Sequence, residues 1–143
     1  MIPLLNGVQA TSSALEAGRI RMEVISQNIA NAHTTRGPDG KPYQRQEVVF
    51  EALLARQIGG NGGVSGNGVA VSRITKDDAP PRLIYNPGHP DANAQGMVAL
   101  PNVNIHEEMV DMISASRAFE ANLAVIKNAR SMAMQTLNLG KRA

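Results

Sequence analysis

Glycine and proline are distributed very unevenly along this chain of 143 residues. The segment from Thr34 to Asn104 holds ten of the thirteen Gly and seven of the eight Pro. Both residues interrupt long helices, Gly because its backbone is too free and Pro because it lacks an N–H donor. We therefore predict two terminal helical segments, 1–33 and 105–143, separated by an irregular, β-rich insertion at 34–104.

The N-terminal segment carries a helical stripe of apolar residues. They recur every seven positions at Val8, Leu15, Met22 and Ile29, with Leu4, Ile25 and Ala32 beside them. The companion residues Thr11 and Gly18 are small, which lets a second helix approach closely. Ser13 and Glu16 could form a capping box, but the stripe extends N-terminal of Ser13, so we predict a helix start near Asn6 or Gly7.

The C-terminal segment carries a longer stripe with spacings of three and four. Its members are Met109, Met112, Ser116, Phe119, Leu123, Ile126, Arg130, Ala133 and Leu137. We expect Asn104 to cap the first turn, with Glu107 at the third position. We expect the helix to end where Gly140 turns left-handed, with Lys141 and Arg142 near the negative end of the dipole.

A second apolar face is predicted on the same C-terminal helix. It consists of Val110, Ile113, Ala121, Ala124 and Val125. A helix that is apolar on more than one face is expected to contact more than one neighbour. The predicted fold class is mainly α with a small β insertion, in which the two long terminal helices pack as a coiled-coil-like pair and need further helices around them.

The insertion is predicted to contain short strands and turns. Val48–Leu54 is compatible with a strand or a short helix, and Val69–Ile74 and Met97–Leu100 are predicted strands. The composition of Gly59–Gly68 predicts a flexible loop. Asn86-Pro87-Gly88-His89 is typical of a type II turn with Pro and Gly at its centre.

No residue pattern of a known catalytic or metal site is complete. His106-Glu107 begins like a zinc-protease HExxH helix, but the second histidine position is Val110. The Gly-rich loop lacks the phosphate-binding pattern, and the Pro-Gly-His-Pro context explains His89 as a turn residue. Cysteine is absent, which excludes disulfides and thiolate chemistry. We therefore predict no enzymatic activity, no cofactor and no metal.

Charge and hydropathy limit the remaining classes. The formal charge of +2 and the pI near 9.3 suggest a basic helical nucleic-acid-binding protein as an alternative. The basic residues of this chain, however, are interspersed with Glu16, Glu23 and Glu120 and are not clustered on one helix face, so we predict no nucleic-acid partner. A cell-wall-cleaving enzyme is a weaker alternative, because no carboxylate pair has a catalytic context. No apolar run is long enough for a membrane span, and we expect no cleaved signal peptide.

Several motifs together resemble the axial proteins of the bacterial flagellum, and their proximal rod members in particular. The N-terminal signature lies in Ser26-Gln27-Asn28-Ile29-Ala30-Asn31-Ala32-His33-Thr34, preceded by Arg21-Met22-Glu23-Val24-Ile25. Matching segments also occur at Pro87–Asn93, Pro101–Ile105 and Glu108–Ile113. In these axial proteins the signature usually continues to Gly-Tyr, and this chain differs from that pattern. Here Thr34-Thr35-Arg36-Gly37 is followed by Pro38, and the nearest tyrosine is Tyr43, which suits a longer loop.

This resemblance implies a structural subunit of the basal-body rod that crosses the periplasm and carries torque. Its terminal helices would form the inner core, and its partners would be copies of itself, other proximal and distal rod proteins, a rod-base adaptor and the flagellar type III export apparatus. Packing residues would be those of the two main stripes. The axial motif residues would be Ser26, Asn28, Ala30, Asn31 and Thr34, and the amides of Asn28 and Asn31 either end the helix locally or bond across subunits.

Overall fold

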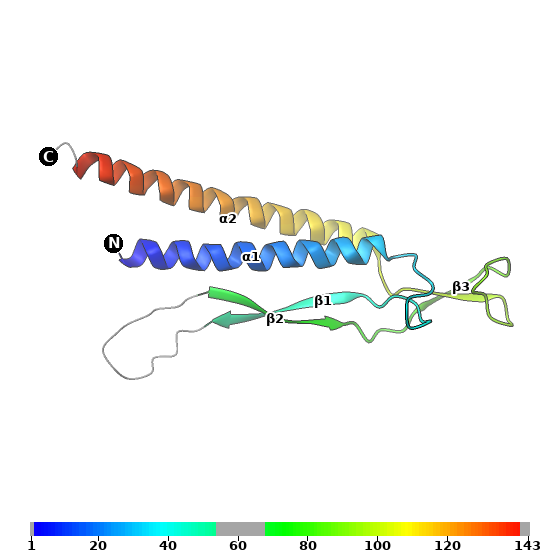
Figure 1. The fold of residues 1–143 in the computed structure, drawn as a ribbon. Helices are drawn as coiled ribbons and strands as arrows, with labels where there is room; N and C mark the ends of the chain where they lie inside the picture. The colour runs from blue at the N-terminus through cyan, green and yellow to red at the C-terminus, as the bar shows by residue number, and fades with distance from the viewer. Residues whose placement is uncertain (1, 54–67, 141–143) are drawn as a thin grey trace, which may run out of the picture.

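The computed structural model describes residues 2–53 and 68–140. Its elements in chain order are α1 (Ile2–Ala30), β1 (Gln46–Leu53), β2 (Gly68–Lys76), β3 (Arg82–Tyr85), β4 (Met97–Leu100) and α2 (Ile105–Gly140). The helix α1 lies between α2 and the β1–β2 hairpin, and the β3–β4 pair lies at the end of the molecule away from both termini (Figure 1). The prediction of two terminal helices that pack together, with a small β-rich insertion between them in the sequence, is confirmed, and the insertion forms two antiparallel strand pairs.

The boundaries of the helices differ from the predicted ones. The start predicted near Asn6 or Gly7 is wrong, because α1 already begins at Ile2. Pro3 is compatible with this start, since the first N–H groups of a helix have no intrahelical partner. Ser13 lies inside α1, and its hydroxyl donates to the carbonyl of Ala10 at 2.8 Å instead of capping an N-terminus.

At α2 the predicted N-terminal cap and the end at Gly140 are confirmed, but the left-handed turn predicted at Gly140 is wrong. The Oδ1 atom of Asn104 accepts a hydrogen bond from the His106 N–H at 3.2 Å. Gly140 is the last helical residue of α2 and does not take a positive φ, so the chain does not turn left-handed there. Lys141 and Arg142 lie outside the described residues.

The strands β1 and β2 form an antiparallel hairpin. The segment Val48–Leu54, which the sequence predicted as either a strand or a short helix, is a strand as far as Leu53. Leu54 lies outside the described residues. The predicted strand Val69–Ile74 is confirmed within the longer β2. A register shift between Val49 and Phe50 leaves Ser72 of β2 without an opposite residue in β1. Of the predicted Gly-rich loop, residues 59–67 lie outside the described residues and Gly68 begins β2.

The second antiparallel pair contains one strand that was not predicted. The predicted β4 is confirmed, and it pairs with β3, where Arg82 lies opposite Leu100 and Tyr85 opposite Met97. The turn predicted at Asn86–His89 exists, since the His89 N–H donates to the Asn86 carbonyl at 3.2 Å. Its type II assignment is wrong, because Gly88 does not have the positive φ that this turn requires.

Buried side chains concentrate where α1 ends and α2 begins. The buried apolar residues are Ala17, Val24, Ile25, Ala32, Val98, Leu100, Val103, Ala115 and Ala129. Most of them belong to the C-terminal half of α1 or to the stretch from β4 into α2. The core therefore holds the two helices together at this end, whereas α2 is exposed from Met134 onward.

Two glycines with positive φ provide a matched test of this part of the fold. Gly96 has φ 74°, and a Cβ built on it would lie 2.9 Å from the Tyr85 ring, whereas Gly40 has φ 71° and open space around it. We expect Gly40→Ala to lower the free energy of unfolding by about 1 kcal/mol from the left-handed backbone alone. Gly96→Ala is expected to cost about 1 to 3 kcal/mol more, because the new methyl overlaps the ring. Equal losses in urea titrations would contradict the described packing of Tyr85.

Candidate interaction site at the helix junction

The side chain of Asn28 is fully buried near the end of α1 and uses its whole hydrogen-bonding capacity. Its Nδ2 donates to the Gln46 carbonyl at 2.9 Å and to Glu108 Oε2 at 3.1 Å. Its Oδ1 accepts from the Gln46 N–H and from the Tyr43 hydroxyl, each at 2.9 Å. An amide offers two donors and two acceptor lone pairs, so Asn28 has none left for another subunit. Of the two alternatives for Asn28, the local helix-end role is replaced by these long-range bonds, and the bond across subunits has no free donor or acceptor left in the single chain.

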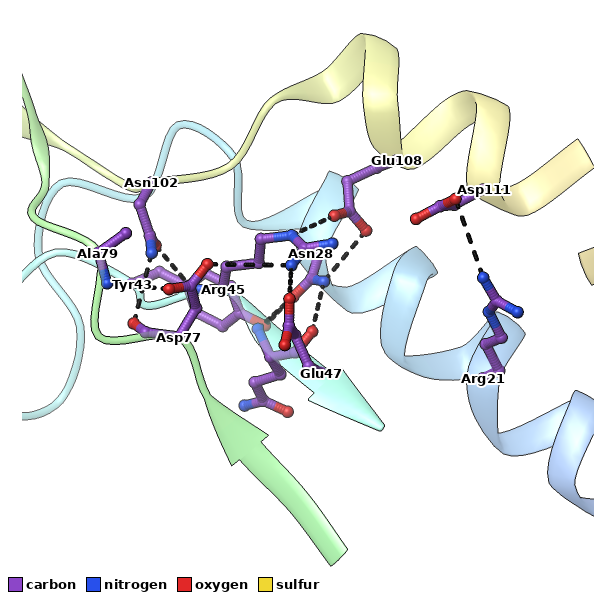
Figure 2. A network of polar contacts seen from close by, with 11 residues as sticks. Arg21, Asn28, Tyr43, Arg45, Glu47, Asp77, Ala79, Asn102, Glu108 and Asp111 are labelled. Atoms are coloured by element: carbon purple, nitrogen blue, oxygen red, sulfur yellow. Dashed lines mark hydrogen bonds and ion pairs between the residues drawn. The ribbon is translucent and has the colours of Figure 1, made fainter. Parts of the chain in front are cut away.

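Glu108 from α2 and Arg45 from the segment before β1 form a buried ion pair beside Asn28 (Figure 2). Glu108 is 1% exposed, and its Oε1 accepts from Arg45 Nε at 2.6 Å. The Arg45 guanidinium also pairs with Glu47 and lies 3.9 Å from Asp77. Burial alone would lower the pKa of Arg45, but the hydrogen bonds and charges of Glu108 and Glu47 outweigh it and hold this pKa above its ordinary value.

We call Asn28, Tyr43, Arg45 and Glu108 the junction cluster. It joins α1, the segment that follows it, the base of β1 and the first turn of α2 (Figure 2). Asn102 extends the cluster toward the strands, since its Oδ1 accepts from the Arg45 N–H at 2.9 Å. No side-chain N or O atom buried within the described residues lacks a hydrogen-bond partner. A fully satisfied polar network of this kind specifies one arrangement of the elements that contribute to it.

The cluster changes the acidity of Tyr43. Burial raises the pKa of the Tyr43 phenol above the ordinary 10.0, and the negative charge of Glu108 raises it further. The neutral phenol is the form that donates to Asn28 Oδ1. This hydrogen bond therefore persists to higher pH than the ordinary pKa of a phenol would allow.

The other polar residues of the predicted axial motif have local roles or face solvent. Asn31 Nδ2 donates to the Gln27 carbonyl at 2.9 Å, and Asn31 Oδ1 accepts from the Thr34 hydroxyl at 3.2 Å. These bonds agree with the local interpretation, in which Asn31 ends the helix and begins the next turn. Ser26 and Ala30 are exposed.

Sequence reasoning missed three of the four members of the junction cluster. Glu108 was named only within a matching segment, Tyr43 only as the nearest tyrosine, and Arg45 not at all. In the sequence Glu108 lies seven residues before Ala115, which lies fourteen before Ala129, but that spacing alone does not show that these positions are buried. Only the fold shows that the carboxylate is buried and therefore needs a partner.

These buried positions belong to the surface of α2 that faces α1, which we call the inner seam: Glu108, Met112, Ala115, Phe119, Ile126 and Ala129. Phe119 packs against Gly18, where a Cβ would lie 3.6 Å from the ring. Closer to the termini, Ile126 and Ala129 line an apolar groove of about 340 Å³ together with Val8 and Thr11 of α1. Small residues on both helices thus permit the close approach that the sequence predicted.

The packing residues predicted from the sequence divide into two groups. Ile25 is buried, and those that are half-buried are Val8, Leu15, Met22, Ile29, Met112, Phe119 and Ile126. Met109, Leu123 and Leu137 are exposed in the single chain. Their predicted contacts with other subunits stay a prediction.

The opposite surface of α2, which we call the outer face, exposes large apolar side chains to solvent. Val110 and Ile113 are 66% and 55% exposed, and Ala121 and Ala124 further along the helix are also exposed. Val125 and Met132 are exposed too, but they line the groove beside α1 and so flank the inner seam. Exposed apolar side chains gathered on one side of a helix mark a protein contact site.

The described residues were also compared with the requirements of a metal site, a pocket and a membrane span. Within 2–53 and 68–140, no three His, Cys, Asp or Glu side chains are grouped so as to hold a metal ion. The cavity next to the junction cluster, about 280 Å³, is lined by Arg21, Arg45, Glu47, Glu108 and Asp111 among others. Neither described helix is sufficiently long and apolar to cross a membrane.

Comparison with known proteins gives matches at both ends of the chain and over its length. Residues 9–38 match the model of the flagella basal body rod protein family, and residues 94–139 match that of the flagellar basal body rod FlgEFG protein C-terminal region. The chain is 45% identical to flagellar basal-body rod protein FlgC of Borreliella burgdorferi, with 90% of this chain and 92% of the relative covered. Identity to FlgC of Yersinia enterocolitica is 43%, covering 96% and 98%, and to FlgC of Bacillus subtilis 42%, covering 95% and 97%.

The nucleic-acid alternative has no support from these matches. In the structure, two basic residues of α1 lie next to carboxylates. Arg19 pairs with Glu16 at 2.7 Å, and Arg21 lies 3.8 Å from Asp111.

Two asparagines of the N-terminal signature allow a direct test of the junction cluster. We expect Asn28→Ala to lower the free energy of unfolding by about 2 to 4 kcal/mol, because it leaves the buried Gln46 backbone groups and Glu108 with fewer partners. Asn31→Ala, which loses only local bonds near the surface, is expected to cost about 1 kcal/mol or less. Chemical denaturation of both variants measures the difference, and similar losses would contradict the central position of Asn28.

The raised pKa of Tyr43 predicts a loss of stability in alkali. In the unfolded chain the phenol ionises near 10.0, whereas the folded state holds its proton to higher pH. The stabilisation is therefore complete below pH 10 and is lost as the pH rises through the higher folded-state pKa. Tyr43→Phe should remove this part of the pH dependence between about pH 9 and 11, measured as urea midpoints. If the urea midpoint of the variant fell with rising pH as steeply as that of the unchanged chain, Tyr43 would not be the group responsible.

Proposed function

Because this chain belongs to the FlgC family of flagellar basal-body rod proteins, it is a structural component of the rod and not an enzyme, and we propose how it is built into that rod. The residues 1–33 and 105–143 form the inner core domain, in which α1 and α2 pack as a coiled-coil-like pair. Residues 34–104 form an outer domain against this pair. The subunit assembles with other basal-body proteins, and cell motility depends on it.

The observation that carries this proposal is the apolar outer face of α2. The inner seam already packs on α1, so Val110 and Ile113 remain for helices of neighbouring subunits. Burying each such side chain stabilises an interface by about 1.5 to 3 kcal/mol. In a tube of helices made of many copies and of related rod proteins, each of these apolar faces would be buried against a neighbouring helix.

The proposed location and neighbours of the subunit are based on the length and exposed faces of its helices. The rod crosses the periplasm and transmits torque, so each subunit needs a stiff element, and a helix of 36 residues spans about 54 Å. We assign proximal and distal rod proteins, the rod-base adaptor and further copies of this chain as its neighbours. Delivery through the flagellar type III export apparatus, without a cleaved signal peptide, suits a chain whose exposed apolar faces are covered only on assembly.

A substitution on the outer face tests the proposal without disturbing the subunit. Ile113→Asp is expected to abolish rod assembly and swimming, because it places a carboxylate in the contact between subunits. The free energy of unfolding of the isolated chain should change by less than about 0.5 kcal/mol, since Ile113 is exposed there. Soft-agar motility and the recovery of basal bodies measure the effect.

Ile113→Leu serves as the matched control and should support normal swimming, because it keeps an apolar side chain of the same size. Swimming cells whose only copy carries Ile113→Asp would rule out the outer face as an assembly surface.

A further inference from the structure

Helix α2 has two apolar sides, and hydrophobicity alone does not decide which of them faces α1. The outer face carries Val110 and Ile113, whereas the inner seam combines the small residues Ala115 and Ala129 with the large Phe119. Burying apolar area is favourable in any orientation of the helix about its axis. Large apolar side chains thus occur on both sides, with Met112 and Ile126 beside Phe119 on the inner seam, so apolar burial does not by itself fix the rotation of α2.

Glu108 supplies a directional interaction. It lies in the first turn of α2, and Val110, two positions later, is about 200° further round the helix. If Val110 faced α1, the Glu108 carboxylate would point away from both Arg45 and Asn28. It would lose its 2.6 Å and 3.1 Å hydrogen bonds and leave Arg45 with only Glu47 and Asp77. Hydrogen bonds to charged groups are among the strongest in proteins and depend on direction.

The receiving side of the contact is also fixed in direction. Asn28 is held by both backbone groups of Gln46, and the Arg45 N–H is held by Asn102. Neither partner is free to follow Glu108 round the helix, as the convergence of side chains from α1, the following segment and α2 illustrates (Figure 2). Arg21 and Asp111 add a weaker contact between the helices at 3.8 Å, where both side chains are partly exposed.

We propose that Glu108 determines which face of α2 packs against α1, and so keeps the outer face available to other subunits. Buried polar groups are best attested in this role of selecting one arrangement among several apolar ones. The choice of face is a property of the single chain. Only its consequence for the rod rests on the proposed function.

The test uses the full-length chain, which contains no cysteine, and compares how fast a maleimide reacts at two positions. One single-cysteine form carries Val110→Cys on the outer face, and the other carries Ala115→Cys on the inner seam, where the alanine is 4% exposed. In the otherwise unchanged chain, Cys at the outer position should react faster by about tenfold or more.

Glu108→Leu should bring the two rates to within about threefold of each other, because the helix no longer prefers one face. This change removes the charge but leaves Arg45 paired with Glu47 and Asp77, and Asn28 bonded to Gln46. Glu107→Leu is the matched control. It removes a carboxylate from the adjacent exposed position and should keep the original ratio of rates.

Three results would overturn the proposal. The first is an unchanged ratio in Glu108→Leu, and the second is an equal collapse of the ratio in the Glu107→Leu control. The third is a loss of the helical circular dichroism signal in Glu108→Leu, because the cluster would then be needed for folding and not for the choice of face. None of these outcomes depends on rod assembly, so each is distinguishable from a failure of the proposed function.

Discussion

The buried pair of Glu108 and Arg45, completed by Asn28, is the interaction on which the arrangement of this subunit depends. Each partner comes from a different part of the chain: α2, the segment before β1, and α1. A buried charge is costly unless it is paired and hydrogen-bonded, so the three parts must meet in one geometry. Apolar packing around the cluster then adds stability to an arrangement that the polar contacts have selected.

Burial is correspondingly uneven along the helices. The end near the junction holds the buried residues Val98, Leu100 and Val103, whereas α2 toward its C-terminus is largely exposed. A rod subunit needs both properties. The junction end keeps the outer β segments attached to the helices, and the exposed helical faces provide the surface through which the proposed tube is built.

The sequence predicted the helices well because their periodicity is local. Met112, Phe119 and Ile126, predicted as packing positions, are half-buried in the single chain, but the same helix has a second apolar side, and periodicity cannot rank the two. The role of Asn28 depends on Gln46, eighteen residues away, which only the folded chain brings next to it. The strand β3 escaped prediction because all four of its residues are exposed and show no alternation.

The most direct test of the account is a cryo-electron microscopy map of the assembled rod that resolves side chains of this subunit. The account predicts that Val110 and Ile113 are buried against helices of neighbouring subunits, while Glu108 contacts Arg45 and Asn28 of its own chain. A map in which these apolar side chains face water, or in which α2 is turned so that they pack on α1, would contradict it.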